Sequence, residues 1–200
     1  MNDVPHIPDA HETFVHIRIF IGMILGIAVS RLVTGLTRFI QHPGQEKPYF
    51  THIVWVAFVL LFIAHFWWFE FALFKKQSWG FGTYFFLLVY AGIFAVIAAL
   101  LFPDRIDEYK GFRGYFLARR RWFYSALLFL FVADLVDTLL KGPEYYALYY
   151  NWDYPLRQGF FILGTGTALI VESETYQKVL AALMLLFQVI WIVGLFEILR

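Results

Sequence analysis

The chain has 200 residues, of which 60% are hydrophobic, 22% aromatic and only 16% charged, and its formal net charge is +1. Soluble domains carry about 45–50% apolar and about 25% charged residues, so this composition excludes an ordinary water-soluble domain and predicts that lipid surrounds much of the chain. The near-neutral charge gives no electrostatic basis for binding nucleic acid, and the absence of cysteine excludes disulfides and thiolate metal sites.

A helix needs about 20 mostly apolar residues to cross the ~30 Å hydrocarbon layer of a membrane. Six segments are candidates: 14–40, 51–75, 80–102, 120–140, 156–172 and 176–199. The fifth segment is shorter and is interrupted by glycines, so it is either a short tilted span or a re-entrant hairpin. The sequence therefore predicts an all-α polytopic membrane helix bundle that forms one domain over residues 1–200, with six spans or with five spans plus a re-entrant segment.

The basic residues between the spans predict the orientation, because short cytoplasmic loops are enriched in Lys and Arg. Segment 103–121 holds six basic residues, so we expect it to be cytoplasmic and the acidic N-terminus to lie outside. Lys75 and Lys76, in the turn after the second span, go against this rule.

Two connections carry many aromatic residues and are expected to lie at the membrane surface. In 104–121 aromatic residues alternate with Arg and Lys, which favours a helix that lies on anionic headgroups. In 141–157 five Tyr and one Trp gather outside any span, which is typical of an aromatic belt at the level of the headgroups. Short interfacial helices are therefore part of the predicted fold.

Ionisable residues inside predicted spans are costly to insert and usually face a partner or water. The second span carries His65 and Glu70, and the fourth carries Asp134 and Asp137. In a six-span bundle these two spans run in the same direction, and a rise of about 1.5 Å per residue places His65 level with Asp134. By the same measure Glu70 lies near the level of Asp137, and Lys141 shares a helix face with both aspartates. The cluster is either a path for protons or cations or a set of structural hydrogen bonds.

The first span has a stripe of small residues spaced four apart: Gly22, Gly26, Ser30 and Thr34. In lipid this spacing favours close packing of a second helix. Arg31 lies next to the stripe, about 13 Å from the inner end of the span. Its side chain is expected either to reach headgroup phosphates or to pair with a carboxylate, and we include it in the candidate polar cluster.

The N-terminal segment places Asp9, Glu12 and His16 on one face if it is helical, and imidazole with carboxylates suits a divalent metal ion. No zinc-binding spacing is present, and Asp9 after Pro8 is also an ordinary helix start. The chain contains no nucleophile elbow, P-loop or dinucleotide-binding glycine motif. We therefore expect neither metal nor cofactor, and nothing in the sequence supports an enzymatic activity.

Several features occur in a distinctive order: GMILGIAVSRLVTGLTRFIQ at 22–41, Trp55, HFWWFEF at 65–71, Trp79 and LLFPD at 100–104. In these features, over residues 20–120, the chain resembles a family of small bacterial polytopic inner-membrane proteins of similar length. The resemblance implies a location in the bacterial inner membrane, and it implies no activity, cofactor or site residue.

Two functions fit these observations. A non-catalytic accessory, assembly or scaffold subunit would dock other membrane proteins, or a second copy of itself, through its helix faces. A small proton- or cation-conducting transporter or channel would instead use His65, Asp134 and Asp137 as its polar path. We expect the first and keep the second as the alternative, and membrane lipids are partners in either case.

Overall fold

The computed structural model is entirely helical in its regular structure over the residues that it describes, 9–43, 47–75 and 79–198. Its elements are α1 (Ala10–Gln41), α2 (Phe50–Phe69), the 3₁₀ helix η1 (Glu70–Lys75), α3 (Phe81–Leu101), α4 (Gly111–Lys141), α5 (Pro143–Tyr149), α6 (Asp153–Ile170) and α7 (Glu174–Ile198). Within these residues five helices are long and apolar enough to cross a membrane: α1, α2 continued by η1, α3, α4 and α7. The predicted all-α class is confirmed for this part of the chain, and the five helices indicate a multi-pass membrane protein. Lys76 and the predicted end of the last span at residue 199 lie outside the described residues.

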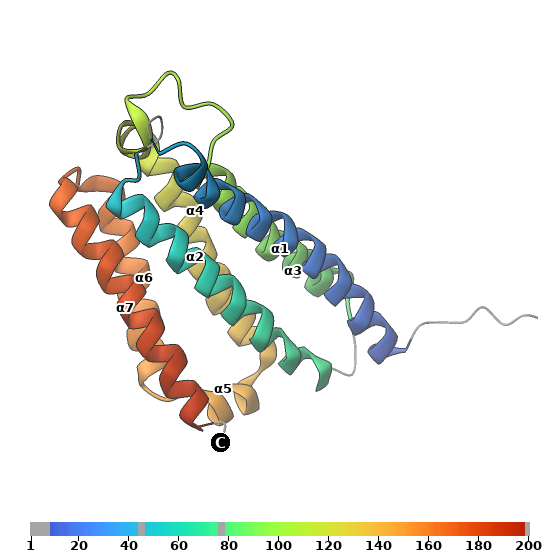
Figure 1. Ribbon diagram of the computed structural model, residues 1–200. Helices are drawn as coiled ribbons and strands as arrows, with labels where there is room; N and C mark the ends of the chain where they lie inside the picture. Colours follow the sequence, from blue (N-terminus) through green and yellow to red (C-terminus); the bar gives the residue numbers. More distant parts are fainter. Residues whose placement is uncertain (1–8, 44–46, 76–78, 199–200) are drawn as a thin grey trace, which may run out of the picture.

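The long helices lie side by side in two layers (Figure 1). One layer contains α1, α2 and α7, and the other contains α3, α4 and α6. Across the layers α1 packs on α3, α2 on α4 and α7 on α6, so α2 and α4 occupy the centre. The short α5 lies at one end of the bundle, which we call the α5 end. The opposite end, formed by residues 42–43, 47–49, 102–110 and 171–173, is called the basic end.

α1 begins at a capping box, in which two side chains bind each other's backbone. The Asp9 carboxylate accepts a hydrogen bond from the Glu12 N–H at 2.7 Å, and the Glu12 carboxylate accepts one from the Asp9 N–H at 3.2 Å. These two candidate metal ligands therefore cap the helix, and His16 packs against the ring of Phe20. Among the described residues no group of three or more His, Asp or Glu side chains could hold a metal ion.

Aromatic rings fill one contiguous core that extends through all the long helices. Trp55, Phe58, Phe94, Tyr124 and Phe131 are completely buried. α2 is apolar on nearly every side, as expected of a helix that has neighbours in both layers. Packing of these rings, rather than exposed polar contacts, holds the helices together.

The two aromatic connections differ from the prediction. Residues 111–121 do not form a separate surface helix but are the first turns of α4, whose 31 residues extend about 46 Å. Such a helix is longer than the ~30 Å hydrocarbon layer, so the same helix crosses the layer and continues beyond it.

The connection after α4 folds partly inwards, onto the end of the bundle. Gly142 has a positive φ of 90° and ends α4, and Pro143 starts α5 directly afterwards. This turn directs Tyr145, Tyr150 and Tyr154 towards the bundle, where they are buried. Three tyrosines of the predicted aromatic belt are therefore part of the buried core.

Ion pairs at the basic end join the start of α4 to the connection between α6 and α7. Arg113 pairs with Glu174 and Arg120 with Glu172, each at 2.5 Å. The hydrogen bond from Arg120 holds the pKa of the exposed Glu172 carboxyl below its ordinary value. Exposed ion pairs contribute little to stability, so they fix this connection without holding the bundle together.

The predicted stripe of small residues on α1 lies mostly on the outside of the described bundle. Gly22 lies against Trp67, but Gly26, Ser30 and Thr34 are exposed. The reason is the rotation of α1, whose buried face instead follows Ile17, Ile21, Leu25, Ala28, Leu32 and Gly35.

α1 approaches the chain at the end of α3 closely at Gly35. A Cβ atom added there would lie 2.2 Å from the ring of Phe102, so only glycine fits.

Gly35→Ala is expected to lower the free energy of unfolding by about 1–3 kcal/mol, because the added methyl group overpacks the contact with Phe102. The matched control is Gly26→Ala on the same helix, where a Cβ meets no atom of another described residue within 4 Å. Thermal unfolding in detergent measures both variants, and the control should keep or raise the midpoint because alanine favours helix. Equal midpoints for the two variants would contradict the close contact between α1 and Phe102.

Candidate functional site

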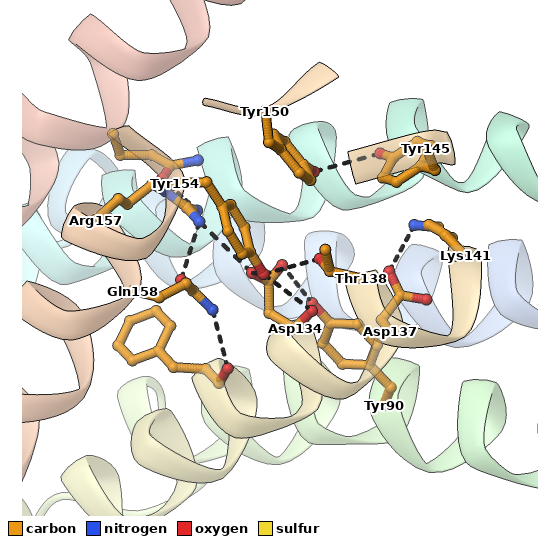
Figure 2. Close-up of polar contacts among 12 residues, drawn as sticks. Tyr90, Asp134, Asp137, Thr138, Lys141, Tyr145, Tyr150, Tyr154, Arg157 and Gln158 are labelled. Carbon is orange, nitrogen blue, oxygen red and sulfur yellow. Dashed lines mark hydrogen bonds and ion pairs between the residues drawn. The ribbon is translucent and has the colours of Figure 1, made fainter. Parts of the chain in front are cut away.

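Buried polar residues gather at the α5 end, where α2, α4, α6 and α7 meet (Figure 2). Hydrocarbon offers no hydrogen bonds, so each of these groups has to find its partner within the protein. We call this set the buried polar cluster; it consists of His65, Glu70, Tyr90, Asp134, Asp137, Thr138, Lys141, Tyr154, Arg157, Gln158 and Gln188.

Lys141 binds two carboxylates in the part of the cluster nearest to α5. Its Nζ lies 2.8 Å from Glu70 Oε1 and 2.5 Å from Asp137 Oδ2. All three side chains are at most 6% exposed. Asp137 and Lys141 are neighbours at i, i+4 on α4, and Glu70 lies at the junction of α2 and η1. Because α2 and α4 both run towards the α5 end, the three side chains meet at one level.

Asp134, one turn before Asp137 on α4, joins three helices. The hydroxyl of Tyr90 on α3 donates to its Oδ1 at 3.0 Å, and Arg157 Nη1 on α6 lies 3.5 Å from its Oδ2. The hydroxyl of Tyr154 lies 3.4 Å from the same Oδ2 and 2.8 Å from Thr138 Oγ1. Figure 2 shows these groups converging on the Asp134 carboxylate.

Arg157 is completely buried and is the second cation of the cluster. Its Nε and Nη2 donate to Gln188 Oε1 at 3.2 and 2.8 Å, and its Nη1 donates to Gln158 Oε1 at 3.1 Å. Gln158 in turn donates to the Phe131 carbonyl at 3.1 Å. Three aromatic rings also lie within 5.3 Å of the guanidinium, those of Phe62, Phe161 and Trp191. These hydrogen bonds hold the positive charge of Arg157 in the centre of the bundle.

Several polar atoms of the cluster have no hydrogen-bond partner within the described residues. They are both ring nitrogens of His65, Glu70 Oε2, Asp137 Oδ1 and Gln188 Nε2. A buried polar atom without a partner destabilises the fold, so an added hydrogen-bond partner at any of these atoms would stabilise the cluster.

A cleft of about 390 Å³ lies beside the cluster at the α5 end. It lies between η1, the last turn of α4 and α5, and its lining includes Leu73, Lys141, Glu144 and Tyr145. Lys141 therefore contacts both the paired carboxylates and the cleft.

Tyrosines cover the cluster on the side of α5. The rings of Tyr150 and Tyr154 stack with their centroids 4.3 Å apart, and the hydroxyls of Tyr145 and Tyr150 lie 3.3 Å apart. Burial raises the pKa of Tyr150 to about 12 and also raises the pKa of Tyr145. Both hydroxyls stay protonated at neutral pH, so they supply hydrogen bonds and no charge.

Phenylalanine rings close the bundle centre on the other side of the cluster. Phe58, Phe62, Phe131 and Phe161 pack together with centroids 4.9–6.0 Å apart, and all four are completely buried. The polar cluster therefore extends from the α5 end to the middle of the bundle, where this aromatic layer separates it from the basic end.

The structure places four of the five predicted cluster residues together at the α5 end. Glu70 and Asp137 meet on Lys141, as described above. His65 makes no hydrogen bond to Asp134, because Tyr90, Tyr154 and Arg157 surround that carboxylate and the imidazole lies between aromatic rings.

Arg31, the fifth residue of the predicted cluster, lies apart from the other four. It lies at the basic end, where its Nη2 donates to Asp104 at 2.8 Å. Its depth, about 13 Å from the inner end of its span, already places Arg31 nearer the basic end than the cluster. The structure adds that its partner there is a carboxylate in the chain just after α3.

Sequence reasoning missed Tyr90, Tyr154, Arg157 and Gln188. A usable signal existed for one of them, since an arginine at the start of the weakly apolar segment 156–172 needs partners when that segment is buried. Tyr154 gave no such signal, because a tyrosine in 141–157 also fits an aromatic belt at the headgroups. Tyr90 lies within the predicted third span, and its sequence position does not identify the carboxylate that it binds.

No protein-family model, curated protein or solved structure matches the chain. The comparisons therefore assign neither a family nor an activity, and any conclusion about chemistry has to come from the buried polar cluster itself.

Lys141→Met is expected to lower the free energy of unfolding by about 3–5 kcal/mol, because it leaves two carboxylates buried without their cation. The matched control is Lys178→Met, which removes an exposed pair with Glu174 and should cost less than about 1 kcal/mol. Denaturant unfolding in detergent measures both variants.

Rescue provides a second control for this prediction. Adding Glu70→Gln and Asp137→Asn to Lys141→Met removes the uncompensated charges and should restore most of the lost stability. If Lys141→Met costs no more than Lys178→Met, Lys141 does not neutralise buried carboxylates.

Proposed function

We propose that the buried polar cluster binds an exchangeable proton and that the protein is a small transporter that moves protons, or cations in exchange for protons, across its membrane. The observation that carries the proposal is the charge balance of the cluster in the described structure. Three carboxylates, Glu70, Asp134 and Asp137, face two cations, Lys141 and Arg157.

An excess negative charge in a dry environment needs a proton or a cation to neutralise it. Arg18 does not supply this charge directly. Arg18 forms no ion pair among the described residues, and its electrostatic interaction with Glu70 acts at longer range. Its guanidinium lies 3.7 Å from the ring centroid of Phe71. The proton is therefore expected within the cluster.

Two oxygens are the expected positions of this proton, Glu70 Oε2 and Asp137 Oδ1. Each belongs to a carboxylate whose other oxygen binds Lys141, and neither accepts a hydrogen bond from any residue that the structure describes. The cleft beside Lys141 supports exchange of this proton with the α5 side of the membrane.

The aromatic layer of Phe58, Phe62, Phe131 and Phe161 supports a gated transporter rather than an open channel. These rings are buried and in mutual contact, so passage to the basic end requires the helices that carry them to rearrange.

Our proposal includes six membrane crossings in a bacterial inner membrane, with the basic end in the cytoplasm and the α5 end outside. α6 is the sixth crossing: its 18 residues extend about 27 Å, and it packs along α4 and α7. Its outward side chains include Leu156, Leu163 and Ile170, all of which are exposed. The basic residues of 103–121 support the orientation.

The accessory or scaffold role, and with it a partner subunit or homo-oligomer, stays a prediction. It would use outward apolar helix faces, but any bundle that crosses a membrane presents such faces to lipid. The exposed surface therefore does not favour it over the transporter.

Asp137→Asn and Glu70→Gln are expected to abolish proton flux, because each removes one of the two carboxylates that share the proton. The measurement is acidification of proteoliposomes that contain a pH-sensitive dye, under an imposed membrane potential. Glu172→Gln, an exposed carboxylate at the basic end, is the matched control and should retain the wild-type flux.

Infrared spectroscopy tests proton binding separately from transport. The wild-type protein should show the C=O stretch of a protonated, buried carboxylic acid at neutral pH, and the two cluster variants should change it. A wild-type spectrum without this band overturns the proton site, whereas a band without any flux above empty vesicles overturns only the transport function.

A further inference from the structure

A groove at the basic end lies on the outer face of α1 and has no part in the buried polar cluster. Its volume is about 680 Å³, and it runs between α1 and the chain just after α3. Met23, Gly26 and Ile27 form its apolar part, and Arg31 and Arg38 line the part nearer the basic end. Met23 and Ile27 are more than 60% exposed, so this apolar wall faces the surroundings of the bundle.

The two arginines of the groove converge on one short segment. Arg31 donates from Nε to the Phe102 carbonyl at 2.9 Å and from Nη2 to the Asp104 carboxylate at 2.8 Å. Arg38 donates from Nη1 to the Pro103 carbonyl at 3.5 Å. Because the three acceptors are consecutive in the chain, the two guanidiniums lie near each other although their residues are two helical turns apart.

The groove has an excess of positive charge. Asp104 is its one carboxylate in the described lining, and the side chain of Asp104 is 89% exposed. Arg38 forms no ion pair with any described carboxylate, and Arg31 Nη1 donates no hydrogen bond within the described residues. Two cations against one carboxylate leave one positive charge and several free N–H donors.

We propose that this groove binds an anionic phospholipid, with the phosphate on Arg31 and Arg38 and one acyl chain along the apolar wall. Guanidinium groups bind phosphate oxygens through strong charge-assisted hydrogen bonds. The single excess positive charge matches a phosphodiester lipid that carries no cationic headgroup. At Gly26 an added Cβ would meet no atom within 4 Å in the part of the chain that the structure describes, so the wall leaves space for an acyl chain.

The occupant is a lipid rather than a free anion because the apolar wall continues from the arginines into the membrane-crossing part of α1. The groove lies at the other end of the bundle from the proton site, so the inference is independent of the proposed function.

The test uses the purified full-length protein in a mild detergent, with bound lipid counted by native mass spectrometry. Phosphatidylglycerol is the probe, and phosphatidylcholine and inorganic phosphate are compared with it. Phosphatidylglycerol should bind roughly tenfold more tightly than phosphatidylcholine, and inorganic phosphate at the same concentration should not displace it.

Three variants locate the site. Arg31→Gln and Arg38→Gln should each weaken phosphatidylglycerol binding by roughly tenfold, the effect of losing one charge-assisted bond. Gly26→Leu should weaken it by filling the apolar part of the groove while both arginines remain. The matched control is Arg121→Gln, a 69% exposed arginine at the same end and outside the groove, which should bind as the wild type does.

Three results would overturn the assignment. Equal binding of both lipids, or an equal loss in Arg121→Gln, means that the basic end attracts lipid without a specific site. Displacement by inorganic phosphate means that the arginines hold a free anion. Conversion of a dimer to a monomer by Gly26→Leu, with lipid binding unchanged, means that a second copy of the chain covers the groove.

Discussion

Lys141 holds two carboxylates and Arg157 holds a third inside a bundle whose surroundings cannot solvate charge. This pairing constrains much of the structure, because an ionised group in hydrocarbon is tolerated only where a partner reaches it. Glu70 comes from α2, Asp134 and Asp137 from α4, and Arg157 from α6. The relative rotation of these three helices is therefore set by the need to bring their polar faces together.

The turn after α4 gives the cluster its boundary. Gly142 and Pro143 reverse the chain immediately after Lys141, so α5 and the start of α6 cover the paired charges with tyrosines. Tyrosine suits this position because its ring excludes water while its hydroxyl hydrogen-bonds to the polar groups beneath it. The same covering leaves a cleft beside Lys141, so the cluster is bounded by phenylalanine on one side and by this cleft on the other.

The charged groups at the two ends of the bundle differ in burial. At the α5 end the charged groups are buried and fix the helices that carry them. At the basic end the ion pairs are largely exposed, and Arg31 and Arg38 face outwards with unused donors. Burial makes the first set a candidate for handling protons, whereas exposure at the membrane surface makes the second a candidate for binding lipid phosphate.

The sequence by itself determined the helical class, the approximate extent of the five apolar helices, and the level at which Glu70 and Asp137 would lie. Hydropathy and helical rise decide these properties, and both act along a single helix. Only the tertiary structure decided that Arg157 joins the cluster, that Arg31 does not, that the tyrosines after α4 fold inwards, and that α1 packs through Gly35 rather than through its stripe of small residues. These outcomes depend on how each helix is rotated about its axis and on which helices become neighbours, and that choice is made by the packing of side chains from distant parts of the chain.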